Sequence, residues 1–295
     1  MARCWGSSSQ FVHAPRVASA DTCLFAIGDI HGHADELEAL HTLVVGAARR
    51  SDMQRKVLVY LGDYVDRGPE IVRTIELLIE QSRLDDGIER VFLAGNHDQF
   101  VVELLAPSAE VDLSFVTMWL DNGGDRTLEQ FGVEGYDRLA MAGDMAGLSQ
   151  CLRRAIGDDA CAFFAGLRAV HREVGYVFVH AGIDPALSLD QQDIADLLLS
   201  REPFLSCRTW QHDFCVVHGH SVAMPRVLPH RIGVDAGCYC NGALCAVQIE
   251  GDCLRFLGVT RRSEFDWNRV LSGRQAEWRW AEARAVDSTV LPAAS

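Results

Sequence analysis

The chain has 295 residues, 48% of them hydrophobic, and carries 41 acidic against 27 basic side chains, a net charge of −14. This length and apolar content suffice for one large α/β domain or two small ones. The acidic balance argues against binding of long nucleic acids, because a surface that repels polyanions lacks the basic groove that they require. Small phosphorylated ligands are not excluded, since bound metal ions can reverse the local potential.

The sequence lacks the usual signals for membranes and secretion. No run approaches the roughly 18 apolar residues of a membrane span, and the first 20 residues lack the apolar centre of a secretory signal. We therefore expect a cytoplasmic protein without a membrane partner. Its ten cysteines are scattered and form no Cys-x-x-Cys pair. We expect reduced thiols packed as small apolar groups, and no zinc site built on them.

Strand and helix patterns alternate over residues 22–105. Strand patterns that end in a glycine followed by polar residues cover residues 22–29, 56–63 and 88–98. Helical patterns follow them over residues 34–50, 69–81 and 99–105, and Pro69 fits the start of its helix, where a missing N–H costs nothing. This alternation predicts a parallel sheet with crossover helices.

The rest of the chain divides into three parts. Residues 106–175 show short helical patterns and turns without a convincing long strand, so we expect a mostly helical insertion or lid. Closely spaced strand patterns return at residues 175–182, 213–220, 231–237, 243–251 and 253–260. Their spacing fits an antiparallel or mixed sheet packed on the first. A helical pattern over residues 274–285 precedes a short tail.

These patterns define the expected domain organisation of an α/β protein. We predict an N-terminal extension over residues 1–20, one main domain over residues 21–260, and a peripheral C-terminal helix and tail over residues 261–295.

Polar side chains follow five of the predicted strands directly. They are Asp29, His31, Asp63, Asn96, His97, His180 and His218. Ligands of α/β sheets bind just beyond the carboxyl ends of the strands, so the five loops should converge on one crevice. Each motif alone could be a turn or a capping residue. Asp63 follows Asp29 by 34 residues and Asn96 follows Asp63 by 33, however, and the joint occurrence favours a site.

The residue types indicate a site for two metal ions. Aspartate, asparagine and histidine offer oxygen and imidazole ligands without thiolate, a set that suits Mn, Fe or Zn. A single tetrahedral zinc would use three or four of them and leave the others as buried polar groups without partners. Two metals account for the number of ligands and can brace the attacking and leaving oxygens of an in-line displacement.

Five short motifs carry a resemblance to a known family. GDIHG, GDYVDRG, GNHD, HAG and HGH resemble, in order and spacing, those of bacterial phosphoprotein phosphatases of the serine/threonine type, within the calcineurin-like metallophosphoesterase superfamily. Weaker similarities lie in NGGDRTL, LLLSREPFL and VDAGCYCNGALCAV. The resemblance implies a four-layer α/β/β/α sandwich of two mixed sheets flanked by helices, with a dinuclear metal centre at one edge.

The resemblance also implies roles for the metal ligands. Asp29 and His31 would bind the first metal, and Asp63 would bridge both. The implied ligands of the second metal are Asn96, His180 and His218. His33 and His220 are expected to be loop or supporting residues and not ligands.

Further roles follow for the residues around the metals. His97 would protonate the leaving alkoxide, and Asp66 would fix its tautomer. Arg67 would hold two phosphoryl oxygens with its planar guanidinium group. Arg201 and Asn96 would also bind the phosphate. Two divalent cations are the implied cofactors, with Mn expected and Fe or Zn as alternatives.

The function implied in this way is direct attack of a metal-bridging hydroxide on a phosphomonoester, with a phosphoprotein or phosphopeptide as the substrate. A diadenosine-polyphosphate hydrolase or another small-molecule phosphoesterase is the alternative. Asp66 favours the phosphomonoesterase, because it completes the acid that a poor alkoxide leaving group needs. A metal-free scaffold without enzymatic activity is disfavoured, because the set of metal ligands is complete. A further alternative is a regulatory role in which the C-terminal helix folds over the cleft.

Overall fold

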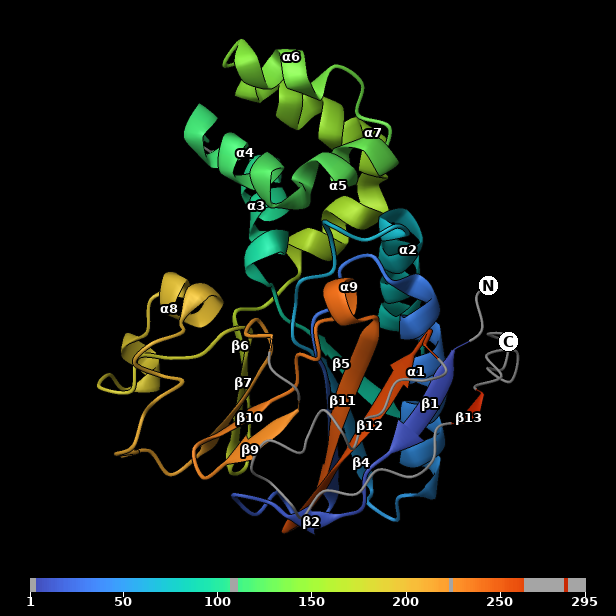
Figure 1. The fold of residues 1–295 in the computed structure, drawn as a ribbon, viewed down its shortest axis with the longest axis vertical. Helices are drawn as coiled ribbons and strands as arrows, with labels where there is room; N and C mark the ends of the chain where they lie inside the picture. Colours follow the sequence, from blue (N-terminus) through green and yellow to red (C-terminus); the bar gives the residue numbers. More distant parts are fainter. Residues whose placement is uncertain (1–3, 107–110, 223–224, 263–283, 286–295) are drawn as a thin grey trace.

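The computed structural model describes residues 4–106, 111–222, 225–262 and 284–285. Within these residues the strands form two sheets, which pack face to face with helices outside them (Figure 1). The predicted α/β fold of two mixed sheets flanked by helices is confirmed.

The first sheet has eight strands among the described residues, in the order β13-β1-β12-β11-β3-β4-β5, with β2 paired to β12. Its parallel part and the connecting helices are β3 (Thr22–Ile27), α1 (Ala34–Arg50), β4 (Arg55–Tyr60), α2 (Ile71–Arg83) and β5 (Ile88–Phe92). Its antiparallel part consists of β1 (Trp5–Ser8), β2 (Val12–His13), β11 (Ala243–Glu250), β12 (Cys253–Thr260) and β13 (Arg284–Ala285).

Alternate residues of the central strands enter two different cores. Phe25 and Ile27 pack against the helices, whereas Leu24 and Ala26 pack against the second sheet. This is the two-residue period of a strand that is covered on both faces. It explains why the strands read as continuous apolar runs in the sequence.

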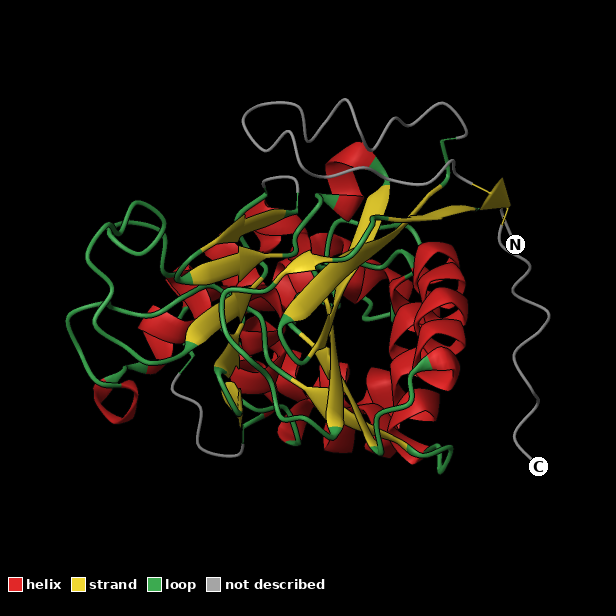
Figure 2. Cartoon of the chain, turned by 90° about the horizontal axis from the view of Figure 1, so that it is seen from below, coloured by secondary structure: helices red, strands yellow, loops and turns green. Residues whose placement is uncertain are grey.

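The second sheet has the order β6-β7-β8-β10-β9 in the described part of the chain. Its strands are β6 (Val170–Glu173), β7 (Tyr176–Val179), β8 (Cys215–His218), β9 (Arg226–Leu228) and β10 (Arg231–Gly233). The short helix α8 (Ile194–Leu199) and its neighbouring loops pack on the outer face through Leu197 and Phe204. Figure 2 shows the strands in the middle of the molecule with helices beside them.

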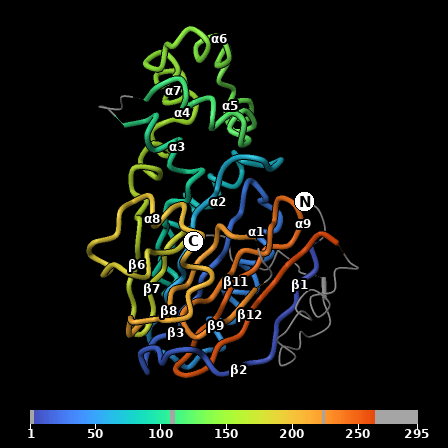
Figure 3. The backbone as a smooth tube through the Cα atoms, turned by 60° about the vertical axis from the view of Figure 1, so that its left-hand side comes forward, coloured from blue at the N-terminus to red at the C-terminus, as the bar shows by residue number. Residues whose placement is uncertain are grey.

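A helical insertion lies above the sheets in Figures 1 and 3. Its elements are α3 (Asn96–Leu105), α4 (Leu113–Trp119), a π-helical turn (Leu120–Gly124), α5 (Asp125–Gln130), α6 (Tyr136–Met141) and α7 (Met145–Ala165). In the described part of residues 106–175, where a mostly helical insertion or lid is expected, the elements are helices apart from β6. β6 is a four-residue edge strand with polar residues, a pattern too short to stand out in the sequence.

Two expected helix starts are displaced. α2 begins at Ile71 with Glu70 as its N-cap, so Pro69 precedes the helix and is not in its first turn. α3 begins at Asn96 with Gly95 as its N-cap, three residues earlier than expected. Asn96 and His97 thus project from a helix start and not from a loop.

Described segments near both ends of the sequence belong to the first sheet. β1 and β2, in the predicted N-terminal extension, pair with β12. Residues 274–283 of the predicted C-terminal helix lie outside the described residues, and its last two residues are instead strand β13, which pairs with β1. Among the described residues, none of the helices is both long and apolar enough to cross a membrane.

Candidate active site

Loops from both sheets meet at one edge of the sandwich. The loops after β3, β4, β7 and β8, with the first turn of α3, bring together Asp29, Asp63, His180, His220 and His97. These positions lie beyond the carboxyl ends of the strands, where ligands of α/β sheets bind.

Asp63 lies between two histidines. Its Oδ2 is 3.3 Å from Nε2 of His31, and its Oδ1 is 3.4 Å from Nε2 of His180. The backbone N–H of His97 donates to Oδ1 at 3.0 Å, and the side chain is 2% exposed. Burial acts to raise the pKa of Asp63, but the neighbouring His180, His97 and His31 outweigh it and hold the pKa well below its usual range. A carboxylate with one oxygen on each side is arranged to bridge two cations.

His180 presents a lone pair to other acceptors. Its Nδ1–H donates to the carbonyl of Leu61 at 2.8 Å, which leaves the lone pair on Nε2. Burial lowers the pKa of His180 and so favours the neutral ring. Nε2 faces Oδ1 of Asn96 at 3.0 Å as well as Oδ1 of Asp63. Acceptors that converge without a proton between them fit a divalent cation, and a histidine oriented by a backbone carbonyl is typical of a metal ligand.

His31 is oriented in the same way. Its Nδ1–H donates to the carbonyl of Val65 at 2.8 Å, so Nε2 is directed at Asp63. Arg67 also donates from Nη1 to this Nε2 at 3.1 Å. A metal ligated by His31 therefore requires the guanidinium of Arg67 to turn away.

The structure corrects the predicted ligand in the HGH motif. His218, the last residue of β8, directs its Nε2 at Nη1 of Arg231 at 3.1 Å and packs on Phe204. It points to the outer face of the second sheet because Val216, two residues earlier, belongs to the core on that face. His220 instead lies with Asp63 and His180, their ligand atoms within 4.8 Å of one another. Burial lowers the pKa of His220 to about 3, so its ring is neutral.

Two further carboxylates are buried beside this cluster. Asp29 accepts the backbone N–H of His220 at 3.0 Å, and burial with the charges of Asp235 and Asp63 raises its pKa well above the usual range. Asp235 has no hydrogen-bond partner for Oδ2, and burial raises its pKa to about 6. Carboxylates that are buried close together repel one another, and bound cations would offset this repulsion.

His97 and Asp66 form a second unit at the start of α3. The Nδ1–H of His97 donates to Oδ2 of Asp66 at 2.6 Å. Asp66 is fully buried, and it accepts hydrogen bonds from Nε1 of Trp119 at 3.0 Å and from the hydroxyl of Thr127 at 2.5 Å. Both donors belong to the helical insertion. This arrangement holds the imidazole of His97 in one tautomer with Nε2 turned to the cluster.

Two arginines face the same space. Arg67 donates from Nη2 to Nε2 of His97 at 2.7 Å, and its guanidinium carbon lies 4.3 Å from the ring centroid of Tyr239. Arg201 follows α8, and its Nη1 is 3.4 Å from the hydroxyl of Ser221. Arg67 can therefore reach the cluster directly, whereas Arg201 lies at its rim.

Backbone strain is concentrated in this region. The non-glycine residues of the described chain with positive φ are His31, Asp63, Asp66, Arg67 and His220, with values of 46° to 69°. Such conformations are costly and collect at functional sites that the surrounding structure holds in place. Glycines permit the close approach: a Cβ on Gly219 would lie 2.1 Å from Oδ1 of Asp29.

The site opens into a cavity of about 1020 Å³. Asp29, Asp63, Arg67 and His97 line one part of it. Side chains from α3, α4 and α8 make up most of the remaining lining, and many of them are apolar. The cavity thus joins a charged region to a largely apolar one.

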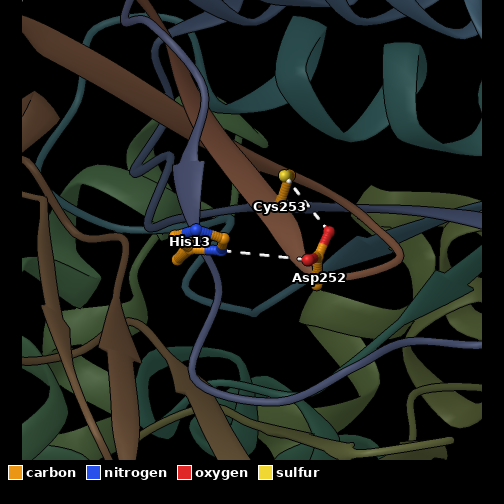
Figure 4. Close-up of side chains that lie close together, drawn as sticks. All are labelled: His13, Asp252 and Cys253. Carbon is orange, nitrogen blue, oxygen red and sulfur yellow. Dashed lines mark hydrogen bonds and ion pairs between the residues drawn. The ribbon is translucent and has the colours of Figure 1, made fainter.

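Another group of metal-ligating residue types lies on the surface, at the turn between β11 and β12 (Figure 4). His13 is 3.8 Å from Asp252, and the Cys253 thiol donates to the same carboxylate. The His13 and Asp252 side chains are 90% and 66% exposed, so water solvates them and we assign no metal there. The ten cysteines are free thiols in this structure, and five of them are buried, so the expected packing as small apolar groups applies to half of them.

Several site residues escaped the sequence analysis. Asp235 and Tyr239 belong to VDAGCYCNGALCAV, and Thr127 belongs to NGGDRTL, two motifs whose similarity to the family is weaker. Trp119, which lies outside the motifs, gave no signal. His220 could have been chosen over His218 from the alternation of side chains along β8.

Comparison with known proteins places these features in a family. Residues 24–226 match the calcineurin-like phosphoesterase family. Serine/threonine-protein phosphatase 1 of Salmonella typhimurium is 32% identical over 35% of this chain and 39% of its own length. The asymmetrical bis(5'-nucleosyl)-tetraphosphatase PrpE of Oceanobacillus iheyensis is 22% identical over 81% of this chain and 92% of its own.

A solved structure shares the fold. A crystal structure described as that of a candidate diadenosine tetraphosphatase has a TM-score of 0.52 and 20% identity, covering 82% of this chain and 96% of its own. The match to the family extends over more than half of the chain and includes the loops of Asp29, Asp63, Asn96 and His180. The chain belongs to the calcineurin-like phosphoesterase family, a family of metal-dependent phosphoesterases.

Proposed function

We propose that the protein is a metal-dependent hydrolase of bis(5'-nucleosyl) tetraphosphates. The cavity of about 1020 Å³ carries this proposal, because it continues from the Asp63 cluster into a large apolar region. A phosphate ester of a small alcohol would occupy only the charged part. A dinucleotide would use both, with its phosphates beside Arg67 and one nucleoside in the apolar part.

The relatives support the same choice. The PrpE tetraphosphatase aligns with 81% of this chain, whereas the serine/threonine phosphatase aligns with 35%. The higher identity of the second match, 32%, applies to a shorter segment. The preference for a protein phosphatase drawn from the sequence is therefore replaced by its alternative.

Two divalent metals would be held on either side of Asp63. His31 and Asp29 are suited to one side, and Asn96, His180 and His220 to the other. Such ions would supply Lewis-acid stabilisation of the phosphoryl oxygens.

The chain's own residues would bind the substrate and move a proton. Arg67 has a planar fork that matches two phosphoryl oxygens. In this structure Arg67 donates to Nε2 of His97, and a protonated His97 could not accept that bond. Turning of Arg67 onto a phosphate would therefore free Nε2 of His97 to hold a proton for the leaving oxygen, with Asp66 stabilising the charged ring.

Hydrolysis of phosphoproteins is the second candidate function. The fully buried Asp66 with its 2.6 Å hydrogen bond to His97 favours it, because an alkoxide leaving group depends on a positioned acid. A nucleotide leaving group, which departs as a stable phosphate anion, depends on the acid less.

The test is a comparison of kcat/KM for diadenosine tetraphosphate and a phosphoserine peptide, with Mn²⁺ added and p-nitrophenyl phosphate as the reference substrate. We expect the dinucleotide to be cleaved faster. Product analysis then separates cleavage to a monophosphate and a triphosphate from cleavage to two diphosphates. Faster hydrolysis of the peptide would replace the first candidate by the second.

A further inference from the structure

We infer that the apolar part of the cavity binds the nucleobase of the substrate, on a surface made by α3 and α4 opposite α8. This inference rests on the proposed function and specifies which side chains recognise the nucleoside. The base-binding surface is defined here as Phe100, Phe115, Met118, Ile194, Leu198 and Leu199.

One face of α3 leads from the reacting end of the cavity to this surface. Asn96, His97, Phe100 and Glu103 all line the cavity. Phe100 follows Asn96 by four residues and His97 by three, and Glu103 follows Phe100 by three, so these side chains lie on one side of the helix. At 1.5 Å per residue, the distance along the axis from Asn96 to Glu103 is about 10 Å. The cavity therefore continues well beyond a phosphate held at His97.

A series of aromatic rings forms the wall on the insertion side. Trp119 donates to both oxygens of Asp66 at 3.0 Å and stacks on Phe100, with ring centroids 6.0 Å apart and planes 12° from parallel. The ring centroids of Phe100 and Phe115 in turn lie 4.8 Å apart. The buried Trp119 and Phe100 fix the position of Phe115, so a flat ligand meets a preformed surface.

Exposed apolar side chains complete the surface on both sides. Met118 on α4 is 51% exposed, and Ile194 and Leu199 on α8 are 48% and 55% exposed. They line the same cavity from opposite sides, and large apolar side chains gathered at a cavity indicate a ligand that covers them.

The charges in the cavity favour a base over a second phosphate group at this end. Glu103 and Asp112 line the cavity near Phe100 and Phe115 in the chain, whereas Arg67 and Arg201 are the arginines among the described residues that line it. Carboxylates repel phosphate but accept hydrogen bonds from the amino group of an adenine. A neutral aromatic ring with amino donors therefore suits this end, and the phosphates belong beside Arg67.

The test compares two ligands that differ only in the base. Calorimetry on the full chain with Mn²⁺ would measure the affinities for AMP and for ribose 5-phosphate. We expect AMP to bind at least roughly 10-fold more tightly than ribose 5-phosphate, because stacking of a base on protein side chains contributes free energy of this size. Phe115→Ala and Met118→Ala should each reduce this ratio several-fold while leaving the affinity for ribose 5-phosphate unchanged. Leu113→Ala is the matched control, because Leu113 is 45% exposed on the same helix but does not line the cavity.

Equal affinities for AMP and ribose 5-phosphate would overturn the inference, as would an unchanged ratio in both variants. A phosphoserine peptide whose binding weakens in Met118→Ala while that of AMP does not would also overturn it and assign the surface to peptides. These binding measurements require no hydrolysis, so a failure of the inference can be distinguished from a failure of the proposed function. If AMP is discriminated but diadenosine tetraphosphate is not cleaved, the base-binding surface stands and the proposed substrate is wrong.

Discussion

The ring centroids of His180 and His220 lie 5.1 Å apart, although the two histidines follow different strands of the second sheet. β7 and β8 are parallel neighbours, so residues just beyond their ends are brought together at one edge. Asp63 approaches from the first sheet and completes the group. One side of the proposed dinuclear site is thus assembled across the interface between the sheets.

The first prediction concerns the two histidines of the HGH motif. His220→Ala should lower the metal content and reduce the hydrolysis of p-nitrophenyl phosphate by roughly 100-fold or more. Loss of a metal ligand should reduce activity at least as much as loss of a residue that hydrogen-bonds to a ligand. His218→Ala removes a ring that contacts Arg231 and Phe204, away from Asp63. It should lower the melting temperature while metal content is retained. Loss of metal in His218→Ala but not in His220→Ala would reverse our correction.

The sequence predicts much of the fold because its signals are local. The apolar alternation of β3 and the periodicity of α1 depend only on neighbouring residues, and residues 34–50 are helical as expected. β1 and β13 are short strands, of four and two residues, whose pairing partners are distant in the chain. Such strands are stabilised by tertiary pairing, which a local pattern does not reveal.

The site was partly predictable for a similar reason. Asp29, Asp63 and His180 follow strands directly, so the topology determines where they meet. The choice of His218 neglected the two-residue period of β8, in which Val217 faces the first sheet and His218 the opposite side. Trp119 and Thr127 reach Asp66 from 53 and 61 residues away, and nothing local in the sequence indicates those contacts.

The second prediction concerns the bridging position of Asp63. In Asp63→Asn the amide keeps one oxygen, and its NH₂ group would face the Nε2 of either His31 or His180. We therefore expect metal analysis to give at most one ion per chain. The rate of p-nitrophenyl phosphate hydrolysis should fall more than about 100-fold. Asp137→Asn is the control, because Asp137 is exposed on α6 and does not line the cavity. Near wild-type hydrolysis by Asp63→Asn with Mn²⁺ would refute the dinuclear assignment.

The third prediction separates proton transfer from the other roles of the site. Asp66→Asn removes the carboxylate that stabilises a protonated His97. Hydrolysis of a phosphoserine peptide should slow by roughly 100-fold, a typical contribution of a positioned acid. Hydrolysis of p-nitrophenyl phosphate should change far less, because nitrophenolate leaves without a proton. Thr127→Ser, which keeps the hydroxyl donor to Asp66, should behave as wild type. Equal losses on both substrates would show that Asp66 acts by another route.

The fourth prediction concerns stability and pH away from the site. His41 on α1 is buried, accepts a hydrogen bond at Nε2 from the Tyr60 hydroxyl at 2.9 Å, and has no partner for Nδ1. Burial, with a smaller effect from the charge of Arg90, lowers the pKa of His41 from 6.5 to about 3. Between these values the unfolded chain binds a proton that the folded chain excludes. The free energy of unfolding therefore falls as the pH falls, by about 1.4 kcal/mol per pH unit from this group.

The double variant His41→Leu/Tyr60→Phe should lose this contribution. Replacing both partners avoids leaving the tyrosine hydroxyl buried without a bond. Urea unfolding at pH 7.5, 6.5, 5.5 and 4.5 would measure the free energy of unfolding of the wild type and of the double variant. The contributions of the other histidines are shared by both proteins and cancel in the difference. Tyr60→Phe alone keeps His41 and should keep the wild-type dependence on pH. Parallel stability curves for wild type and the double variant below pH 6.5 would show that His41 is protonated in the folded protein, which would require the core between α1 and β4 to admit water.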